Sequence, residues 1–347
     1  MSEALKLTTY FGERDRSGDA FLADALADLY ARHELRTSLV LRGVAGFGVK
    51  HHLRTDRLLT LSEDLPIVSV AVDERPHIEA IVGEVVDLFG AGLITLERTA
   101  TLPADDEVKL TVYVGRGERA GDAPASVAVV DVLHRHGVAG ATVLLGVDGT
   151  VRGTRYRAHF FGSNAQVPVM IIAIGASATV QAALAELREL LADPLHTVER
   201  VRVCKRDGAR LAEPAPVAGT DPSGLAVWQK LMVYCGEQSQ HAGQPLYLEL
   251  VRALRAAGAA GATALRGVWG YHGDHAPHGD TFWQLRRRVP VVVVIVDTPE
   301  RIRRWFAIVD DLTDETGLVT SEQVPALRAT GPGIARGGLR LARPGVR

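Results

Sequence analysis

The spacing of apolar residues divides the N-terminal part of the chain into six predicted elements. Residues 5–11 alternate as a strand does, with one face formed by Leu5, Leu7, Thr9 and Phe11 and the other by Lys6, Thr8 and Tyr10. Residues 19–33 change to the spacing of an amphipathic helix. The remaining elements are predicted strands at 36–44, 65–72 and 93–97 and a second helix at 75–89.

This pattern occurs three times along the chain. Residues 5–12 return as 108–115 and again as 229–236, and a glycine-containing turn begins 32 residues after the tyrosine of each copy. Repeats of βαββαβ order predict the α+β, ferredoxin-like sandwich, with the first and third strands central. The predicted organisation is domain 1 at 1–103, a degenerate domain 2 at 107–205, a flexible linker at 206–227, domain 3 at 228–328, and a basic disordered tail at 329–347.

The third predicted strands carry apolar runs that do not alternate, such as 291–296. A two-layer sandwich leaves one sheet face in water, so an uninterrupted run predicts that the second face is covered as well. The expected cover is the sheet faces of the other two copies, arranged about a pseudo-threefold axis. The alternative is one very apolar strand in each of three independent domains.

Composition excludes several classes of function. The 39 basic and 41 acidic residues of this 347-residue chain nearly cancel, so we expect no nucleic-acid partner and no electrostatic footprint for a membrane surface. Two cysteines imply no disulfide framework and favour a reducing cytoplasm. No signal peptide is readable after Met1, and the longest apolar run is far short of a membrane span, which predicts a soluble protein without membrane insertion.

Several segments of copies one and three resemble the DUF190 family of PII-like proteins. They are residues 42–48 (Arg-Gly-Val-Ala-Gly-Phe-Gly), 61–66 (Leu-Ser-Glu-Asp-Leu-Pro), 92–95 (Gly-Leu-Ile-Thr), 296–301 (Val-Asp-Thr-Pro-Glu-Arg) and 317–320 (Gly-Leu-Val-Thr). The resemblance implies a ferredoxin-like fold and a homotrimer, so this chain looks like a monomeric, fused pseudo-trimer. PII-like proteins sense small molecules, often adenine nucleotides, in clefts between subunits.

The first candidate site is the Arg-Gly-x-x-Gly turn after the second strand. Its residues are Arg42, Gly43, Gly46 and the nearby Lys50 in copy one, and Arg266, Gly267 and Gly270 in copy three. Glycine lets backbone amides approach an anion, and the basic side chains supply charge. The alternative is a turn that needs positive φ. Copy two has Leu145 in place of the arginine, which suggests a lost site.

The second candidate is the bend after the second helix, with Gly90 and Gly92 in copy one and Gly317 in copy three. The resemblance implies phosphate binding near this position through backbone N–H groups. A helix C-cap is the alternative, because glycine is expected there as well. Copy two has Asp193-Pro194-Leu195 at the bend.

Other motifs give weaker signals. His272, His275 and His278 are weak candidates for a zinc or copper site, and a solvated loop is the simpler interpretation. Residues 115–121 imitate a dinucleotide fingerprint, but the other copies lack its middle glycine, so we reject it. Asp73 and Asp297 are interpreted as helix-capping residues. No nucleophile and base recur between the copies, so no catalytic residue is assigned.

Together these features predict a non-enzymatic regulatory protein that binds a small anion between its domains. An adenine nucleotide is the ligand that the resemblance suggests. Binding is expected to order the loops at 44–62 and 268–288, which then signal to a regulated protein such as a membrane transporter. The alternatives left open are a metal-binding protein that uses the histidine loop and an unrecognised enzyme.

Overall fold

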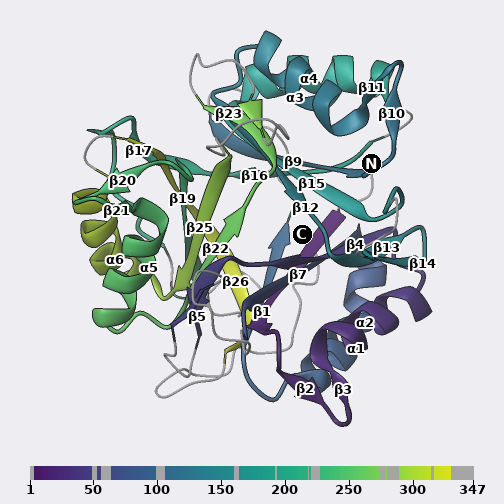
Figure 1. The fold of residues 1–347 in the computed structure, drawn as a ribbon. Coiled ribbons are helices and arrows are strands. Elements are labelled where there is room, and N and C mark those ends of the chain that lie inside the picture. Colours follow the sequence, from purple (N-terminus) through teal and green to yellow (C-terminus); the bar gives the residue numbers. More distant parts are fainter. Residues whose placement is uncertain are drawn as a thin grey trace, which may run out of the picture.

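The structure is a computed structural model of the chain. It describes residues 4–48, 53–55, 64–98, 106–159, 164–191, 194–217, 219, 227–272, 278–279, 289–313 and 316–329. Three units, each a sheet with two helices on its outer face, surround a common centre (Figure 1). We call them units 1, 2 and 3 in chain order. Lys50, His275 and the predicted tail from residue 330 onward lie outside the described residues.

Each unit is an antiparallel sheet with the strand order second, third, first, fourth. Unit 1 contains β1 (Ala4–Gly12), α1 (Leu22–Arg32), β4 (Thr37–Arg42), β7 (Pro66–Glu74), α2 (Arg75–Leu88) and β8 (Leu93–Arg98). Unit 2 contains β9 (Glu107–Gly115), α3 (Ala125–Arg135), β12 (Gly140–Leu145), β15 (Pro168–Ala176), α4 (Ser177–Leu190) and β16 (Leu195–Arg200). Unit 3 contains β19 (Val227–Gly236), α5 (Leu246–Ala256), β22 (Ala262–Arg266), β25 (Pro290–Asp297), α6 (Pro299–Leu312) and β26 (Leu318–Ala329). The predicted ferredoxin-like order, with the first and third strands central, is confirmed.

A two-stranded hairpin precedes the first helix of every unit and was not predicted. The three hairpins are β2 (Arg16–Ser17) with β3 (Ala20–Phe21), β10 (Arg119–Ala120) with β11 (Ala123–Pro124), and β20 (Gln240–His241) with β21 (Gln244–Pro245). The rejected dinucleotide-like motif at 115–121 runs from the end of β9 into the second hairpin. There the Gly115 amide donates to the Glu118 carboxylate over 2.9 Å, so it is already bonded within the turn.

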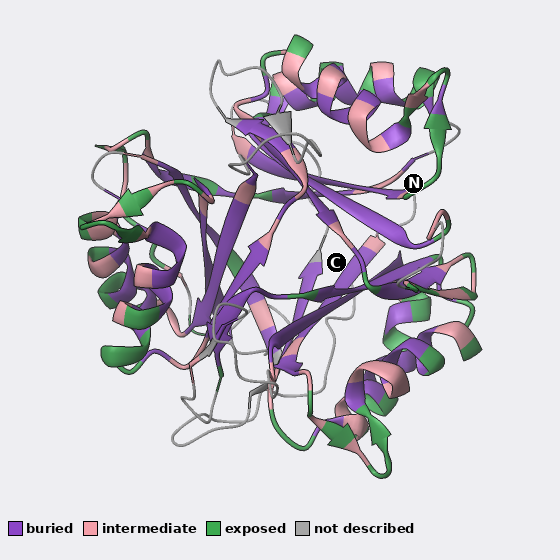
Figure 2. Cartoon of the chain, viewed as in Figure 1, coloured by how far each residue is buried: buried purple, intermediate pink, exposed green. Residues whose placement is uncertain are grey.

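Each sheet buries two faces, one under its own helices and one against the other sheets (Figure 2). In α1 the apolar face consists of Leu22, Leu26, Leu29 and Tyr30, all buried on the sheet of unit 1. The opposite sheet faces form a central core to which all three third strands contribute. Its members from those strands are Val68, Val70, Val72, Met170, Ile172, Val292, Val294 and Val296. This double burial is the physical reason why the third strands do not alternate.

The segments after the second strands cross to neighbouring units. β5 (Ala45–Phe47) of unit 1 pairs with β22 of unit 3, and β13 (Asp148–Val151) of unit 2 pairs with β4 of unit 1. β23 (Trp269–His272) of unit 3 pairs with β12 of unit 2, which completes a cycle of exchanged strands. The fourth strands extend too. β17 (Arg202–Arg206) of unit 2 pairs with β26, and the end of β26 pairs with β8 of unit 1.

A ring of buried ion pairs lies where the first and fourth strands face the centre. Lys6 Nζ lies 2.5 Å from Glu199 Oε1, Lys109 Nζ lies 2.5 Å from Glu322 Oε2, and Lys230 Nζ lies 2.7 Å from Glu97 Oε1. Each lysine therefore binds a glutamate of a neighbouring unit, from 1 to 2, from 2 to 3 and from 3 to 1. All six side chains are at most 7% exposed.

The opposite charges of this ring offset the cost of removing one another from water. Burial alone would lower the pKa of Lys6, but the carboxylates of Glu199 and Glu97 outweigh it and raise that pKa well above its ordinary value. Burial alone would raise the pKa of Glu97, but Lys230, Lys6 and Lys109 hold it well below its usual range. For Lys109 burial dominates and lowers the pKa. The three lysines and three glutamates balance one another in charge.

The predicted flexible linker begins as ordered structure. β17 turns back into β18 (Ala209–Arg210), and the Lys205 ammonium lies 2.8 Å from the Asp310 carboxylate of α6. Arg210 also binds Asp310, at 2.9 Å. The first part of this segment is therefore a hairpin fixed to unit 3. This hairpin follows the fourth strand of unit 2 directly. The linker was predicted because the residues farther along are rich in proline and glycine.

Candidate ligand-binding cleft

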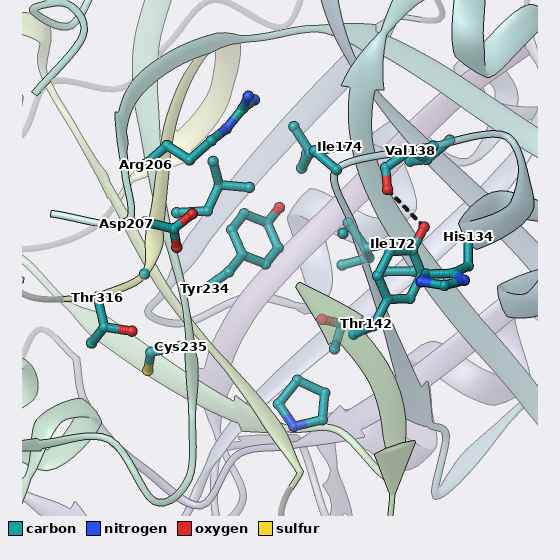
Figure 3. Close-up of a pocket in the computed structure, with 18 residues that line it drawn as sticks. His134, Val138, Thr142, Ile172, Ile174, Arg206, Asp207, Tyr234, Cys235 and Thr316 are labelled. Atoms are coloured by element: carbon teal, nitrogen blue, oxygen red, sulfur yellow. Dashed lines mark hydrogen bonds between the residues drawn. The ribbon is translucent and has the colours of Figure 1, made fainter. Parts of the chain in front are cut away.

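A cleft of about 400 Å³ lies between units 2 and 3 (Figure 3). Unit 2 contributes the turn from α3 into β12, residues 137–142, and two side chains of β15. Unit 3 contributes the end of β19, the bend at Thr316 and Gly317, and Tyr271 of β23. The exchanged strand β23 and the extension β17 therefore bring parts of two units to one place.

One wall of the cleft is apolar. Ile172 and Ile174 of β15 and Leu318 of β26 line it, and the ring of Tyr234 stands opposite the two isoleucines (Figure 3). Ile172 and Leu318 are only 5% and 9% exposed, so this wall belongs to the packed interior and is fixed before any ligand arrives. Apolar walls with a few convergent polar groups are typical of small-molecule sites.

The polar groups of the cleft include one basic side chain from β17. Arg206 Nη2 lies 3.2 Å from Glu107 Oε1, and the Arg206 side chain is 39% exposed. Its buried Nε has no hydrogen-bond partner among the described residues. Asp207, which follows Arg206, and Thr316 lie on the same side of the cleft. The guanidinium therefore has an unused donor beside an apolar wall.

His134 and Tyr271 form the opposite side. Their rings meet edge to face with centroids 4.8 Å apart, and Tyr271 Oη donates to Val138 O over 2.8 Å. Burial raises the pKa of Tyr271, so its hydroxyl stays protonated as a donor. Because Tyr271 belongs to β23, this contact lies at the base of the long loop of unit 3. A ligand in the cleft would contact that base.

No described arrangement in the cleft suggests catalysis. Cys235 lines it, but burial raises the pKa of this thiol to about 12, which leaves it a poor nucleophile. Within the described ranges no group of three or more histidine, cysteine, aspartate or glutamate side chains is placed to hold a metal ion. The side chains of His272 and His278, like all of His275, lie outside the described part of the chain.

A smaller cleft of about 180 Å³ occupies the corresponding place between units 1 and 2. Tyr113 and Leu195 pair across its strands as Tyr234 and Leu318 do in the larger cleft. Here Pro194 precedes the leucine where Gly317 does in unit 3. The repeat therefore builds the same cleft twice, with different side chains.

The arginines of the Arg-Gly-x-x-Gly turns are bound within their own units. Arg42 Nε lies 2.7 Å from Glu13 Oε1, and Arg266 Nη2 lies 2.8 Å from Glu237 Oε1. In unit 2, where the arginine is Leu145, the acid is replaced as well, by Arg116. Arginine and glutamate are therefore either both present or both absent in a unit. This indicates that the arginine serves an ion pair within its own unit.

The glycines of these turns are needed for close approach between strands. A Cβ at Gly43 would lie 2.7 Å from Pro66 Cγ, and at Gly46 it would lie 2.4 Å from Ala262 O. Gly267 and Gly270 are equally enclosed, with Pro290 Cγ at 2.8 Å and Ala141 O at 2.2 Å. Neither Gly43 nor Gly46 has positive φ, so the reason for glycine is space and not the conformation expected of a turn.

Their amides are engaged too. The N–H of Gly43 donates to Pro66 O over 2.8 Å, and that of Gly267 donates to Pro290 O over 2.7 Å. The next residues, Val44 and Val268, donate to neighbouring units. These four amides hold the exchanged strands in place.

Of the glycines at the predicted bend, Gly317 lines the larger cleft. Gly317 and Gly92 have φ of +100° and +131°, where side chains are strained. Each lies against the carbonyl of the first-strand tyrosine, since a Cβ at Gly92 would be 2.6 Å from Tyr10 O and one at Gly317 would be 3.0 Å from Tyr234 O. Both lie beyond the helix caps, Phe89 and Thr313. Gly90 is exposed, and a Cβ there would meet nothing.

The aspartates at the ends of the third strands, Asp73 of β7 and Asp297 of β25, are buried hydrogen-bond acceptors. Asp73 accepts from the amides of Arg36 and Glu74, and Asp297 accepts from Trp305 Nε1 over 2.9 Å. Neither is the N-cap residue. That position belongs to Glu74 and Thr298, without a side-chain cap bond.

Sequence reasoning missed Arg206, His134 and Tyr271. Arg206 fell in the predicted linker, although Val201, Arg202 and Val203 just before it alternate as a strand does. The lysines of the ring had a clearer signal. A lysine precedes the repeat tyrosine by four positions in every copy, and a glutamate follows in every fourth strand.

The repeated ferredoxin-like units, with a cleft between two of them, place the chain among tandem-repeat α+β proteins. The model of the DUF190 family, described as "Uncharacterized ACR", matches residues 4–101, 107–203 and 228–326. The chain belongs to this family and contains three copies of its domain.

Solved structures give only weak likenesses. Aspartate kinase from Synechocystis is 10% identical, with a TM-score of 0.27 over 92% of this chain, and the chain spans 43% of it. The small subunit of acetolactate synthase from Thermotoga maritima is 13% identical, with a TM-score of 0.20 over 58% of this chain and 98% of the subunit. An unknown protein from Galdieria sulphuraria is 14% identical, with a TM-score of 0.17, over 58% of this chain and 99% of that chain. Scores this low give no information on function.

In the part of the chain that the structure describes, the helices are too short or too polar to cross a bilayer.

Proposed function

We propose that this chain is a PII-like, ligand-sensing regulatory protein built as a pseudo-trimer in one polypeptide. The cyclic strand exchange and the cyclic ion-pair ring support this arrangement, because each joins unit to unit in the same way around the centre. Its domains are residues 1–103, 107–205 and 228–328. It works as a monomer, since the three units already complete one another.

The ligand is a small anion, an adenine nucleotide in the first instance, bound between units 2 and 3. The observation that carries this proposal is the cleft itself, in which Arg206 stands beside the apolar wall formed by Ile172 and Ile174. A flat apolar group fits such a wall, and a guanidinium binds phosphate or carboxylate with paired N–H groups. Gly317 completes the floor of the cleft at the bend.

The protein acts by binding and not by catalysis. Ligand contact with Tyr271 at the base of the unit 3 loop changes how that loop meets a regulated protein, such as a membrane transporter. The two unpaired, buried cysteines, Cys204 and Cys235, fit a reducing compartment, and we propose the cytoplasm.

Isothermal titration of the purified full chain with ATP, ADP, AMP and cyclic AMP tests this function. We expect saturable heat from at least one nucleotide, because the cleft offers both an apolar wall and a cation. Flat traces from all four nucleotides would exclude an adenine nucleotide as the ligand.

A further inference from the structure

We propose that the chain holds one anionic ligand and not three, and that Arg206 binds the anionic group of that ligand. This inference rests on the proposed function and assigns it to a single cleft. The registers of the strand extensions, the side chains that line the second cleft and the environment of Arg206 support it.

Arg206 is delivered to the cleft by a strand extension that has a direct counterpart. Arg206 of β17 pairs with Leu318 at the start of β26, and Ala329 of β26 pairs with Leu93 at the start of β8. Both extensions shift register at the same point, between Val203 and Lys205 in one and between Ala326 and Arg328 in the other. At the junction of units 3 and 1, Ala329 therefore occupies the strand position that Arg206 occupies between units 2 and 3. An alanine at this position cannot supply a positive charge for an anion.

The cleft between units 1 and 2 differs in another way. Thr37 and Gly140 each begin a second strand, so Arg36 stands in the smaller cleft where Ala139 stands in the larger one. Pro194 replaces Gly317 as well, and proline has no N–H to offer an anion. Arg36 and Pro194 are larger than Ala139 and Gly317, and the cleft they line has a volume of about 180 Å³ against about 400 Å³.

An ion-pair cluster also fixes the loop of unit 2 beside this smaller cleft. Arg155 of β14 (Thr154–Arg157) lies 2.6 Å from Asp24 and 2.5 Å from Asp28, both on α1 of unit 1. It also lies 2.5 Å from Asp148 of β13, whose side chain is 8% exposed. Because the hairpin of β13 and β14 is held on the neighbouring helix, its base is not free to adapt to a ligand.

The environment of Arg206 suits it to hold an anion that arrives from outside. Arg206 forms an ion pair with Glu107, and its buried Nε has no hydrogen-bond partner among the residues that the structure describes. Arg206 lines the cleft on the same side as Asp207 and Thr316 (Figure 3). Glu107 competes with a bound anion for the same guanidinium, so it moderates the affinity of the site.

Titration calorimetry of the full chain with ATP, AMP and inorganic phosphate tests this inference. We expect one site per chain, and Arg206→Ala should weaken nucleotide binding roughly 10- to 100-fold, the loss of a charge-assisted hydrogen bond. Arg202→Ala is the matched control on the same strand, since Arg202 donates to Glu213 O outside the cleft lining, and its affinity should equal that of the wild type. Glu107→Gln should tighten binding about two- to five-fold, because a competing surface ion pair is removed.

The outcomes separate the two proposals. Two or three sites per chain would overturn the single site, and nucleotide affinity unchanged in both Arg206→Ala and Glu107→Gln would overturn the role of Arg206. Either result would leave the ligand-sensing function standing. No heat from any nucleotide or from inorganic phosphate would overturn both. Binding of inorganic phosphate as tightly as AMP would show that the free anion is the ligand and that the apolar wall contributes nothing.

Discussion

Replacing Lys109 by methionine should lower the free energy of unfolding by about 3–5 kcal/mol, the cost of leaving a buried charge without its partner. Lys109 binds both carboxylate oxygens of Glu322, at 2.6 and 2.5 Å, and its loss leaves the central ring with one excess negative charge. The pKa of Glu322 is lowered although burial opposes it, because Lys109 and Lys230 stabilise the carboxylate. Urea unfolding followed by circular dichroism measures the change.

The double variant Lys109→Met with Glu322→Met separates charge balance from packing. It leaves Lys6, Lys230, Glu97 and Glu199, which pair among themselves within 2.7 Å, so more than half of the lost stability should return. Arg135→Met is the control at an exposed ion pair and should cost less than about 1 kcal/mol. A double variant as unstable as Lys109→Met would show that the ring acts through packing and not through charge.

Replacing Gly46 by alanine should destabilise the protein at the upper end of the ~1–3 kcal/mol typical of overpacking. The new Cβ would lie 2.4 Å from Ala262 O and 2.9 Å from Pro66 Cγ, and the carbonyl cannot retreat without parting β5 from β22. Gly48→Ala is the matched control two positions along, where a Cβ would meet nothing within 4 Å. Thermal and urea unfolding of the two variants give the comparison.

This pair of variants also distinguishes two roles for the Arg-Gly-x-x-Gly turn. If the glycine serves the exchange of strands, stability falls in Gly46→Ala and nucleotide affinity changes little in the molecules that remain folded. Unchanged stability with lost nucleotide binding would instead support the turn as an anion site. The Gly146 and Gly149 of unit 2 favour the first role, because glycine persists there although the arginine does not.

The arrangement within each unit could be predicted because it depends on local patterns. Alternation at 5–11 reflects the sheet face that the unit's own helices cover. Helical spacing at 75–89 reflects the helix face that packs on that sheet. The exchange of β5, β13 and β23 could not be predicted in the same way, because their partners lie in other units and the glycine in each is typical of loops. Strand pairing across such distances leaves no period in the sequence.

Some residues of the candidate site could likewise be predicted from the local sequence, and others could not. Gly317 was predicted from its motif and does line the cleft. Arg206 was not, because its role depends on where an extension of one unit meets the bend of another. The lysines of the ring were visible in the repeat, yet lysine on a strand face is ordinarily taken as solvent-exposed. Only the three-dimensional arrangement shows that this face is the centre of the molecule.

Hydrogen–deuterium exchange with and without saturating ATP tests the central claim most directly, because it locates the ligand on the chain. If ATP binds between units 2 and 3, exchange should slow at residues 137–142, 204–207 and 316–318. Exchange should not change in the smaller cleft between units 1 and 2, which Arg36 and Pro194 line. Protection confined to residues 36–48 and 194–195, with none between units 2 and 3, would contradict it.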